Sequence, residues 1–147
     1  MSEHDQVKFG GMTPILRVND LPASLDYYTN VLGFANDWGI VDGFASISRD
    51  HCHLFLSEHD QGHTGSWVYI GVDDVEKLFV QLKARGAKIR HPPTNYDWAR
   101  EMQVEDPSGN ILRIGSDPTP GEPTGEWLDM EGRRWMHTEQ GWVEVKA

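Results

Sequence analysis

The sequence predicts an α+β fold of two βαβββ modules with a short β-meander at the C-terminal end. The first observation is the alternation of apolar residues from Trp67 to Val72, which is typical of a strand with two different faces. The second is that strand, capped helix and further strands follow one another twice, an internal repeat at about 12–57 and 66–116. We therefore expect two mixed sheets that curl around a concave cavity, each with a helix on its back.

The first module should begin with a strand from Thr13 to Val18, after a loose leader over residues 1–11. Asn19 and Asp20 offer an N-cap for the helix that follows. Gly33 is placed to end that helix as a C-cap glycine. An apolar stripe at helical spacing supports the helix and consists of Leu21, Leu25, Tyr28 and Leu32.

Three strands are expected to complete the first module. Phe34 to Ser48 predicts two of them around a turn at Asp42 and Gly43. His51 to Ser57 predicts the third, and residues 58–65 after it are polar and contain glycine, which is typical of a linker.

The helix of the second module repeats the pattern of the first. A strand over residues 67–72 leads to a possible N-cap at Asp73 and Asp74, and Gly86 is placed to end the helix. Its apolar stripe consists of Val75, Leu78, Phe79 and Leu82.

The strands of the second module are less regular in sequence. Ala87 to Arg90 predicts a short strand, and residues 91–95, which include two prolines, are expected to form a loop. Glu101 to Glu105 and Asn110 to Gly115 are expected to pair as a hairpin. Proline and glycine in residues 106–109 supply the turn between them.

The C-terminal part differs from both modules. Residues 117–125 are rich in proline and glycine and predict a linker, and Gly132 and Gly141 mark turns in a small β-meander after it. We expect one domain over residues 1–116 and a linker with an extension over 117–147, which covers part of a crevice or strengthens a dimer. The extension contains three tryptophans, Trp127, Trp135 and Trp142.

Composition limits the functions that the chain can have. The formal net charge of −10 disfavours binding to nucleic acid or to an anionic membrane surface. No stretch approaches the roughly 20 apolar residues of a membrane-spanning helix. Cys52 is the single cysteine, which excludes an internal disulfide, and residues 1–5 are polar rather than signal-like. We therefore expect a cytoplasmic protein.

Seven short stretches of the two modules match motifs of a known family: Leu16 to Leu21, Tyr27 to Phe34, Asp42 to Ala45, Leu54 to Ser57, Trp67 to Ile70, Trp98 to Glu101 and Glu105 to Asn110. Over about residues 12–116 the chain resembles the vicinal-oxygen-chelate superfamily of glyoxalases, bleomycin-resistance proteins and dioxygenases. It is most similar to the bleomycin-resistance branch, because aromatic residues stand at Phe44, Trp67 and Trp98.

The resemblance also places the metal-ligand positions of the superfamily's enzymes on this chain. These four positions fall on Thr13, Phe55, Trp67 and Arg113. None of these side chains suits a catalytic metal, which needs about three protein ligands and an open position. The resemblance therefore implies a chain with no metal, no cofactor and no catalytic residue.

Histidines leave a metal-dependent alternative open. His51 and His53 share one face of a strand and could together bind zinc, whereas Cys52 points to the opposite face. His59 and His63 in the polar linker could hold an adventitious ion. The alternative function is a divergent glyoxalase- or dioxygenase-like enzyme with an unusual metal set that includes His53.

The bleomycin-resistance branch implies binding without chemistry. Its pattern is a homodimer with two interface crevices, each holding a planar drug between aromatic rings and the drug's cationic tail along acidic groups. Flat ligands stack on such rings, and cationic ligands gain further from the ring faces. For this chain we expect sequestration of a bleomycin-type or similar planar, cationic antibiotic, and hence antibiotic resistance. The expected ligand-binding residues are Trp38, Phe44, Phe55, Ser57, Trp67, Tyr69, Trp98, Arg100 and Arg113, with Asp42, Glu58, Asp60 and Asp97 for the cationic tail.

A third function class is a domain that only binds a protein partner, with the tryptophan-rich extension as its contact. The residues leave open whether the two modules pair within one chain or exchange between two chains.

Overall fold

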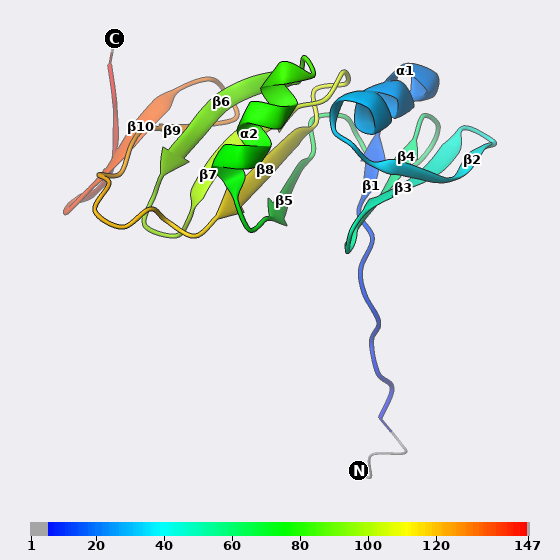
Figure 1. Ribbon diagram of the computed structural model, residues 1–147, viewed down its shortest axis with the longest axis horizontal. Coiled ribbons are helices and arrows are strands. Elements are labelled where there is room, and N and C mark those ends of the chain that lie inside the picture. The colour runs from blue at the N-terminus through cyan, green and yellow to red at the C-terminus, as the bar shows by residue number, and fades with distance from the viewer. Residues whose placement is uncertain (1–5, 147) are drawn as a thin grey trace.

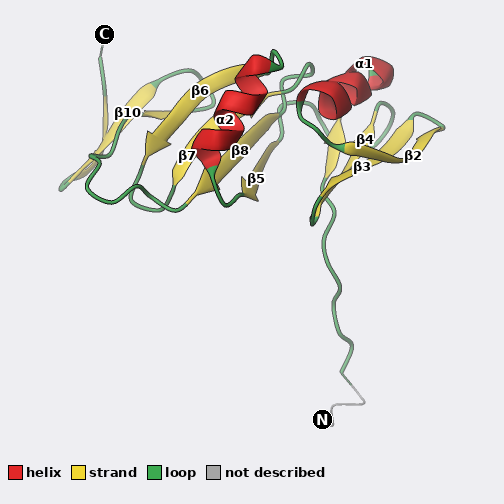
Figure 2. Cartoon of the chain, in the orientation of Figure 1, coloured by secondary structure: helices red, strands yellow, loops and turns green. Residues whose placement is uncertain are grey.

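The computed structural model describes residues 6–146, so part of the predicted leader lies outside the described residues. Residues 6–14 have no regular secondary structure and run away from the body of the molecule as an extended segment (Figure 1). The two predicted modules lie side by side after this segment, and the C-terminal meander lies against the second module (Figures 1 and 2). The α+β architecture with an internal repeat is confirmed.

Module one has a four-stranded sheet in the order β1-β4-β3-β2. Strands β1 and β4 are parallel, and the other neighbours are antiparallel. Its elements are β1 (Ile15–Arg17), α1 (Leu21–Asp26), η2 (Tyr27–Val31), β2 (Ala35–Val41), β3 (Phe44–Arg49) and β4 (Cys52–Ser57).

Module two repeats this topology, with the order β5-β8-β7-β6 and a parallel pair β5 and β8. The meander is a separate three-stranded antiparallel sheet in the order β11-β10-β9. The elements of this half are β5 (Trp67–Gly71), α2 (Val75–Ala84), β6 (Lys88–Asn95), β7 (Arg100–Glu105), β8 (Ile111–Ser116), β9 (Trp127–Leu128), β10 (Arg134–Thr138) and β11 (Gly141–Glu144).

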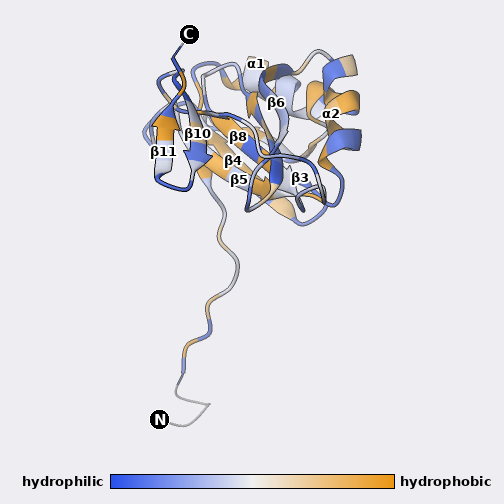
Figure 3. Cartoon of the chain, turned by 90° about the vertical axis from the view of Figure 1, so that its left-hand side faces the viewer, coloured by the Kyte–Doolittle hydropathy of each residue, from blue (hydrophilic) through white to orange (hydrophobic). Residues whose placement is uncertain are grey.

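Each helix covers one face of its sheet, and the hydrophobic core lies between them. Met102 and Ile114 face Val75 and Leu82 of α2 within one buried cluster. Because side chains alternate along a strand, the residues between them project from the opposite face of the sheet. Figure 3 shows hydrophobic residues on β8, whereas β10 of the separate meander sheet is largely hydrophilic. The face opposite α2 is therefore the one available to a ligand.

The first predicted helix is confirmed, but its second half is not α-helical. Asp20 caps it as predicted, since its Oδ1 accepts a hydrogen bond from the backbone N–H of Ala23 at 3.1 Å. From Tyr27 to Val31 the chain forms a π-helix, in which the backbone N–H of Leu32 donates to the carbonyl of Tyr27. This wider turn brings Tyr28 and Leu32 into the core.

The prediction of a loop over residues 91–95 was wrong, because β6 continues to Asn95 through two prolines. Strand β6 is at the edge of its sheet, where a missing backbone N–H breaks no hydrogen bond on the open side. Its pairing with β7 also shifts register on either side of His91, between Ile89 and Thr94. Proline signalled an irregular edge strand here rather than a loop.

A buried polar network joins the two modules. The Tyr28 hydroxyl donates to Asp106 Oδ2 at 2.9 Å, and Asn110 Nδ2 donates to the carbonyl of Arg17 at 2.8 Å. Asp106 also accepts from the backbone N–H groups of Ser108 and Asn110, as the predicted turn requires. Burial raises the pKa of Tyr28 well above its ordinary value, so its hydroxyl remains a donor.

The meander is confirmed, and it covers the face of sheet two that lies opposite α2. Gln103 is buried there and donates from Nε2 to the carbonyl of Leu128 at 2.9 Å. Arg90 Nη2 donates to the carbonyl of Asp129, and the Tyr96 hydroxyl donates to the carbonyl of Glu126. These bonds attach the extension to its own module.

Candidate ligand-binding site

The meander presents its aromatic side chains on one face because of its strand register. Trp135 on β10 stands opposite Trp127 on β9, and His137 on β10 stands opposite Trp142 on β11. Residues directly opposite each other project to the same side of a sheet, and Trp135 and His137 are two residues apart. All three tryptophans of the extension therefore share one face.

A pocket of about 560 Å³ lies between this face and module two. That volume is within the range of small-molecule sites. The ring centroids of Trp98 and Trp127 are 6.0 Å apart, and those of Trp98 and Trp142 are 6.1 Å apart. Tyr96 supports the wall by stacking on Trp98 at 4.8 Å with an interplanar angle of 5°. The pocket is lined by Trp98, Arg113, Trp127, Asp129, Trp135 and Trp142.

Arg113 is the cation of this pocket, and Glu101 holds it in place. Arg113 Nε donates to Glu101 Oε1 at 2.8 Å and its Nη2 donates to Oε2 at 3.2 Å. The indole N–H of Trp98 donates to the same carboxylate at 2.9 Å. The guanidinium lies over the rings of Tyr69 and Trp127, at 5.3 and 4.9 Å from their centroids. A planar cation is thus fixed between two aromatic faces.

Asp129 is the carboxylate that lines the pocket, and its hydrogen bonds are internal to the meander. Its Oδ1 accepts from the backbone N–H groups of Glu131 and Arg133, and its Oδ2 accepts from Trp135 Nε1 and Arg133 Nε. The hydrogen bond from Trp135 is the largest cause that lowers the pKa of Asp129 to about 2. Asp129 therefore orients Trp135 and closes the β9–β10 turn.

The structure divides the predicted ligand-binding residues into two groups. Trp98 and Arg113 line the pocket. Trp67 and Tyr69 lie beside it: the ring centroids of Trp67 and Trp127 are 6.3 Å apart, and the Arg113 guanidinium lies over the half-exposed ring of Tyr69. Of the others, Trp38, Phe44, Phe55 and Ser57 belong to module one, and Arg100 lies at the start of β7 in module two. Trp38, Phe44 and Phe55 form their own cluster on sheet one, with Trp38 stacked on Phe44 at 6.2 Å and Phe44 5.1 Å from Phe55.

Within residues 6–146, no aromatic contact joins the module-one cluster to the pocket of module two. Ser57 is buried in sheet one, where its carbonyl accepts from the backbone N–H of Val18. Arg100 forms ion pairs with Glu76 and Glu122, which tie α2 to the linker, and it is not part of the pocket lining. The nine predicted residues therefore do not share one crevice in a single chain.

The histidines that suggested a metal site do not gather with other ligands. His51 and His53 are exposed, and Cys52 is half-buried on the other face of β4. Burial raises the pKa of the Cys52 thiol. In the part of the chain that the structure describes, no three His, Cys, Asp or Glu side chains are grouped as a metal would require. In the same part of the chain, no helix is both long and apolar enough to cross a membrane.

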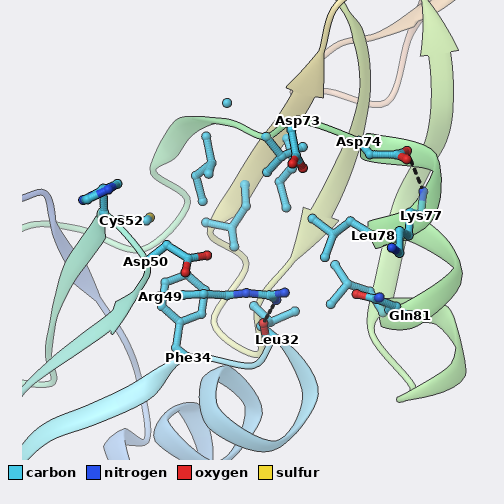
Figure 4. Close-up of a pocket in the computed structure, with 17 residues that line it drawn as sticks. Leu32, Phe34, Arg49, Asp50, Cys52, Asp73, Asp74, Lys77, Leu78 and Gln81 are labelled. Atoms are coloured by element: carbon cyan, nitrogen blue, oxygen red, sulfur yellow. Dashed lines mark hydrogen bonds between the residues drawn. The ribbon is translucent and has the colours of Figure 1, made fainter.

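A second hollow of about 590 Å³ lies between the modules on the side of the helices (Figure 4). Two of its polar groups serve the fold: Arg49 Nη1 donates to the carbonyl of Leu32 at 2.9 Å, and Asp74 caps α2 by accepting from the backbone N–H of Lys77 at 3.0 Å. Phe34 is the one aromatic side chain among its lining residues. This groove lacks the facing rings that a flat ligand needs, in contrast to the tryptophan pocket.

Four of the six pocket residues were not predicted from the sequence, and all four belong to the extension. The signal was present in the spacing of Trp135 and His137, which are two residues apart and therefore place two rings on one side of the strand. The sequence pattern does not say which surface that side covers. The four residues are Trp127, Asp129, Trp135 and Trp142.

Comparison with known proteins places this geometry in a family context. The family model of the Glyoxalase/Bleomycin resistance protein/Dioxygenase superfamily matches residues 9–114. Among curated proteins, no sequence relative of this chain was found. The meander and three of the four pocket tryptophans lie beyond the matched residues.

Several solved structures are similar to the chain. The bleomycin-binding protein of Streptomyces verticillus, solved with copper(II)-bleomycin, has 27% identity and a TM-score of 0.65, covering 76% of this chain and 98% of its own. TnmS3, an antibiotic-binding protein from Streptomyces sp. CB03234, has 20% identity and a TM-score of 0.65, with coverages of 78% and 100%. A glyoxalase/bleomycin resistance protein/dioxygenase from Nocardioides has 22% identity and a TM-score of 0.62, with coverages of 83% and 93%.

Proposed function

The chain belongs to the glyoxalase/bleomycin resistance protein/dioxygenase superfamily, and on this premise we propose that it binds and sequesters a planar, cationic antibiotic of the bleomycin type without altering it. The observation that carries the proposal is the tryptophan pocket, in which four indole rings surround a space of about 560 Å³. Aromatic planes of this kind bind flat heteroaromatic rings by stacking.

The charges in the pocket also favour binding over chemistry. The resemblance places Arg113 where the superfamily's enzymes would have a metal-ligating glutamate, and Glu101 accepts two hydrogen bonds from it. Thr13, Phe55 and Trp67 occupy the other three ligand positions. The side chains at these four positions do not form the ligand set that a metal-activated water would need, which favours binding of a ligand over metal-dependent chemistry.

We further propose that the protein acts as a homodimer in the cytoplasm and confers resistance by sequestration. Sheet one leaves apolar side chains uncovered in the single chain, since Ile15, Trp38 and Ile40 are 39%, 50% and 45% exposed. A second copy placed with sheet one opposite the tryptophan pocket would bury these groups. It would also bring Phe44 and Phe55 toward the drug, so that one crevice draws its residues from both chains.

A fluorescence titration tests this proposal. Chelator-treated protein is titrated with bleomycin, once metal-free and once loaded with copper, and tryptophan emission is recorded. The proposal predicts saturable quenching with one ligand per subunit in both titrations. Mass spectrometry of the recovered drug should show it unchanged. Absence of quenching up to high micromolar drug would remove bleomycin as the ligand, and a modified drug would show that the protein is an enzyme.

A further inference from the structure

We propose that the pocket closed by the C-terminal meander selects the chemistry of the ligand's flat end. It takes a planar aromatic ring that bears a hydrogen-bond acceptor, such as a carbonyl or carboxylate oxygen, against Arg113, and it leaves any cationic group outside. This inference rests on the proposed function and names the part of the ligand that this site recognises.

Glu101 and Asp129, the two carboxylates that hold side chains of the pocket in place, are already occupied by internal hydrogen-bond donors and have little capacity left for a cation. Glu101 is 1% exposed and accepts three hydrogen bonds, two from Arg113 and one from Trp98. Asp129 accepts four hydrogen bonds, all from groups of the β9–β10 turn and its strand. A carboxylate that is already satisfied by internal donors gives little to an ammonium or guanidinium group of a ligand.

Within residues 6–146, side chains of the pocket keep hydrogen-bond donors that a ligand can use. Arg113 has five N–H bonds, and its Nε and Nη2 atoms are engaged by Glu101. Among residues 6–146, no acceptor is found for Arg113 Nη1 or for the indole N–H groups of Trp127 and Trp142. A ligand that brings oxygen acceptors to these donors gains hydrogen bonds, whereas one that brings N–H donors gains none.

Arg113 also gives the pocket wall a positive charge. The guanidinium of Arg113 lies 4.9 Å from the centroid of Trp127, on the wall that a ligand ring would contact. A second cation in the pocket would be repelled by it. A carboxylate lies outside the pocket, because exposed Asp97 is 3.3 Å from His137, whose ring centroid is 4.9 Å from that of Trp142. A cationic tail can therefore lie at the mouth while the flat end lies inside.

The pocket is a property of this chain's extension. Trp127, Trp135 and Trp142 follow the matched segment of residues 9–114, and only Trp98 and Arg113 of the lining come from within it. The proposed selection of the ligand's flat end therefore depends on the meander, which adds three indole rings to the pocket that Trp98 and Arg113 of module two also line.

A matched series of naphthalene compounds tests the inference. Isothermal titration calorimetry of the full chain at pH 7 compares 2-naphthoate, 2-naphthamide, 2-methylnaphthalene and 2-naphthylmethylammonium, which share one ring system and differ in the attached group. We expect naphthoate and naphthamide to bind at least about tenfold more tightly than the ammonium compound, a difference of about 1.4 kcal/mol.

Two arginine variants locate the effect. Arg113→Lys keeps the charge and a partner for Glu101 but removes the planar fork, so the preference for the two acceptor compounds should fall to less than about threefold. Arg49→Lys is the control, because Arg49 lines the hollow on the side of the helices, donates to the carbonyl of Leu32 and does not line the tryptophan pocket. Its preference should equal that of the unaltered protein. Near-UV circular dichroism verifies that both variants keep the tryptophan packing.

The outcomes separate the two proposals. Equal or tighter binding of the ammonium compound, or a preference that Arg113→Lys does not change, would overturn the inference and leave antibiotic binding intact. If bleomycin binds and no naphthalene compound does, the inference is also overturned and antibiotic binding is again left intact. If neither bleomycin nor any naphthalene compound binds, the proposed function fails and the inference fails with it.

Discussion

Replacing Glu101 by Gln should destabilise the protein strongly, because this buried carboxylate holds both the cation and one wall of the pocket. Glu101 is 1% exposed and accepts hydrogen bonds from Arg113 and Trp98. Glutamine keeps one acceptor oxygen but turns an N–H group toward the donors of Arg113. The variant therefore loses charge-assisted hydrogen bonds and leaves a guanidinium without its counter-ion.

The size of the effect follows from the burial of the two partners. Removing one member of a fully buried ion pair costs about 3–5 kcal/mol. Arg113 is 29% exposed and can recruit water on its open side, so we expect a loss of about 3 kcal/mol, at the lower end of that range. The matched control is Glu122→Gln, which removes a 42%-exposed partner of Arg100 and should cost less than about 1 kcal/mol.

Urea denaturation followed by far-UV circular dichroism measures these losses without relying on the pocket's own tryptophans. A double-mutant cycle with Arg113→Met isolates the pair, and we expect a coupling energy of at least about 1.5 kcal/mol. A coupling energy below about 0.5 kcal/mol, together with a small effect of Glu101→Gln, would show that Glu101 does not position Arg113.

Two further predictions concern the module junction and the meander. Tyr28→Phe removes a buried hydrogen-bond donor to Asp106. The free energy of unfolding, measured by urea denaturation, should fall by about 1.5–3 kcal/mol. A loss below about 0.5 kcal/mol would exclude this bond as a link between the modules. Asp129 has its pKa lowered from 3.8 to about 2, so the stability that it gives the meander is complete above pH 3.8 and lost as the pH falls through 2. An acid titration of the Trp135 indole resonance should show this transition, and Asp129→Asn should abolish it; persistence of the transition in that variant would assign it to another group.

Local sequence signals predicted the modules well because each signal corresponds to a local physical cause. The caps at Asp20 and Asp74 both accept the expected backbone N–H, and alternation along β5 and β8 separated the helix-facing residues from the ligand-facing ones. The π-helix after Asp26 was not predictable in the same way. Its residue Tyr28 bonds to Asp106, a residue that is distant in sequence, and such a contact has no local sequence signal.

The candidate site was predicted only in part, because it depends on packing between distant segments. Trp98 and Arg113 could be assigned from the resemblance of module two to its family. The sequence placed Trp127 in a separate meander, but the surface that the meander covers depends on long-range hydrogen bonds such as those from Arg90, Tyr96 and Gln103. Trp38 was grouped with these residues on its aromatic character alone, and the fold places it on the other sheet.

The most direct test of the central claim is to observe the pocket tryptophans while the antibiotic binds. The six indole N–H resonances of the protein, assigned by single substitutions, are followed in ¹H–¹⁵N spectra during a titration with bleomycin. Binding in the tryptophan pocket predicts saturable shifts of the Trp98, Trp127 and Trp142 resonances with one common affinity. Unchanged resonances of these three residues at saturating drug would contradict the account, because the ligand would then bind away from the pocket or not at all.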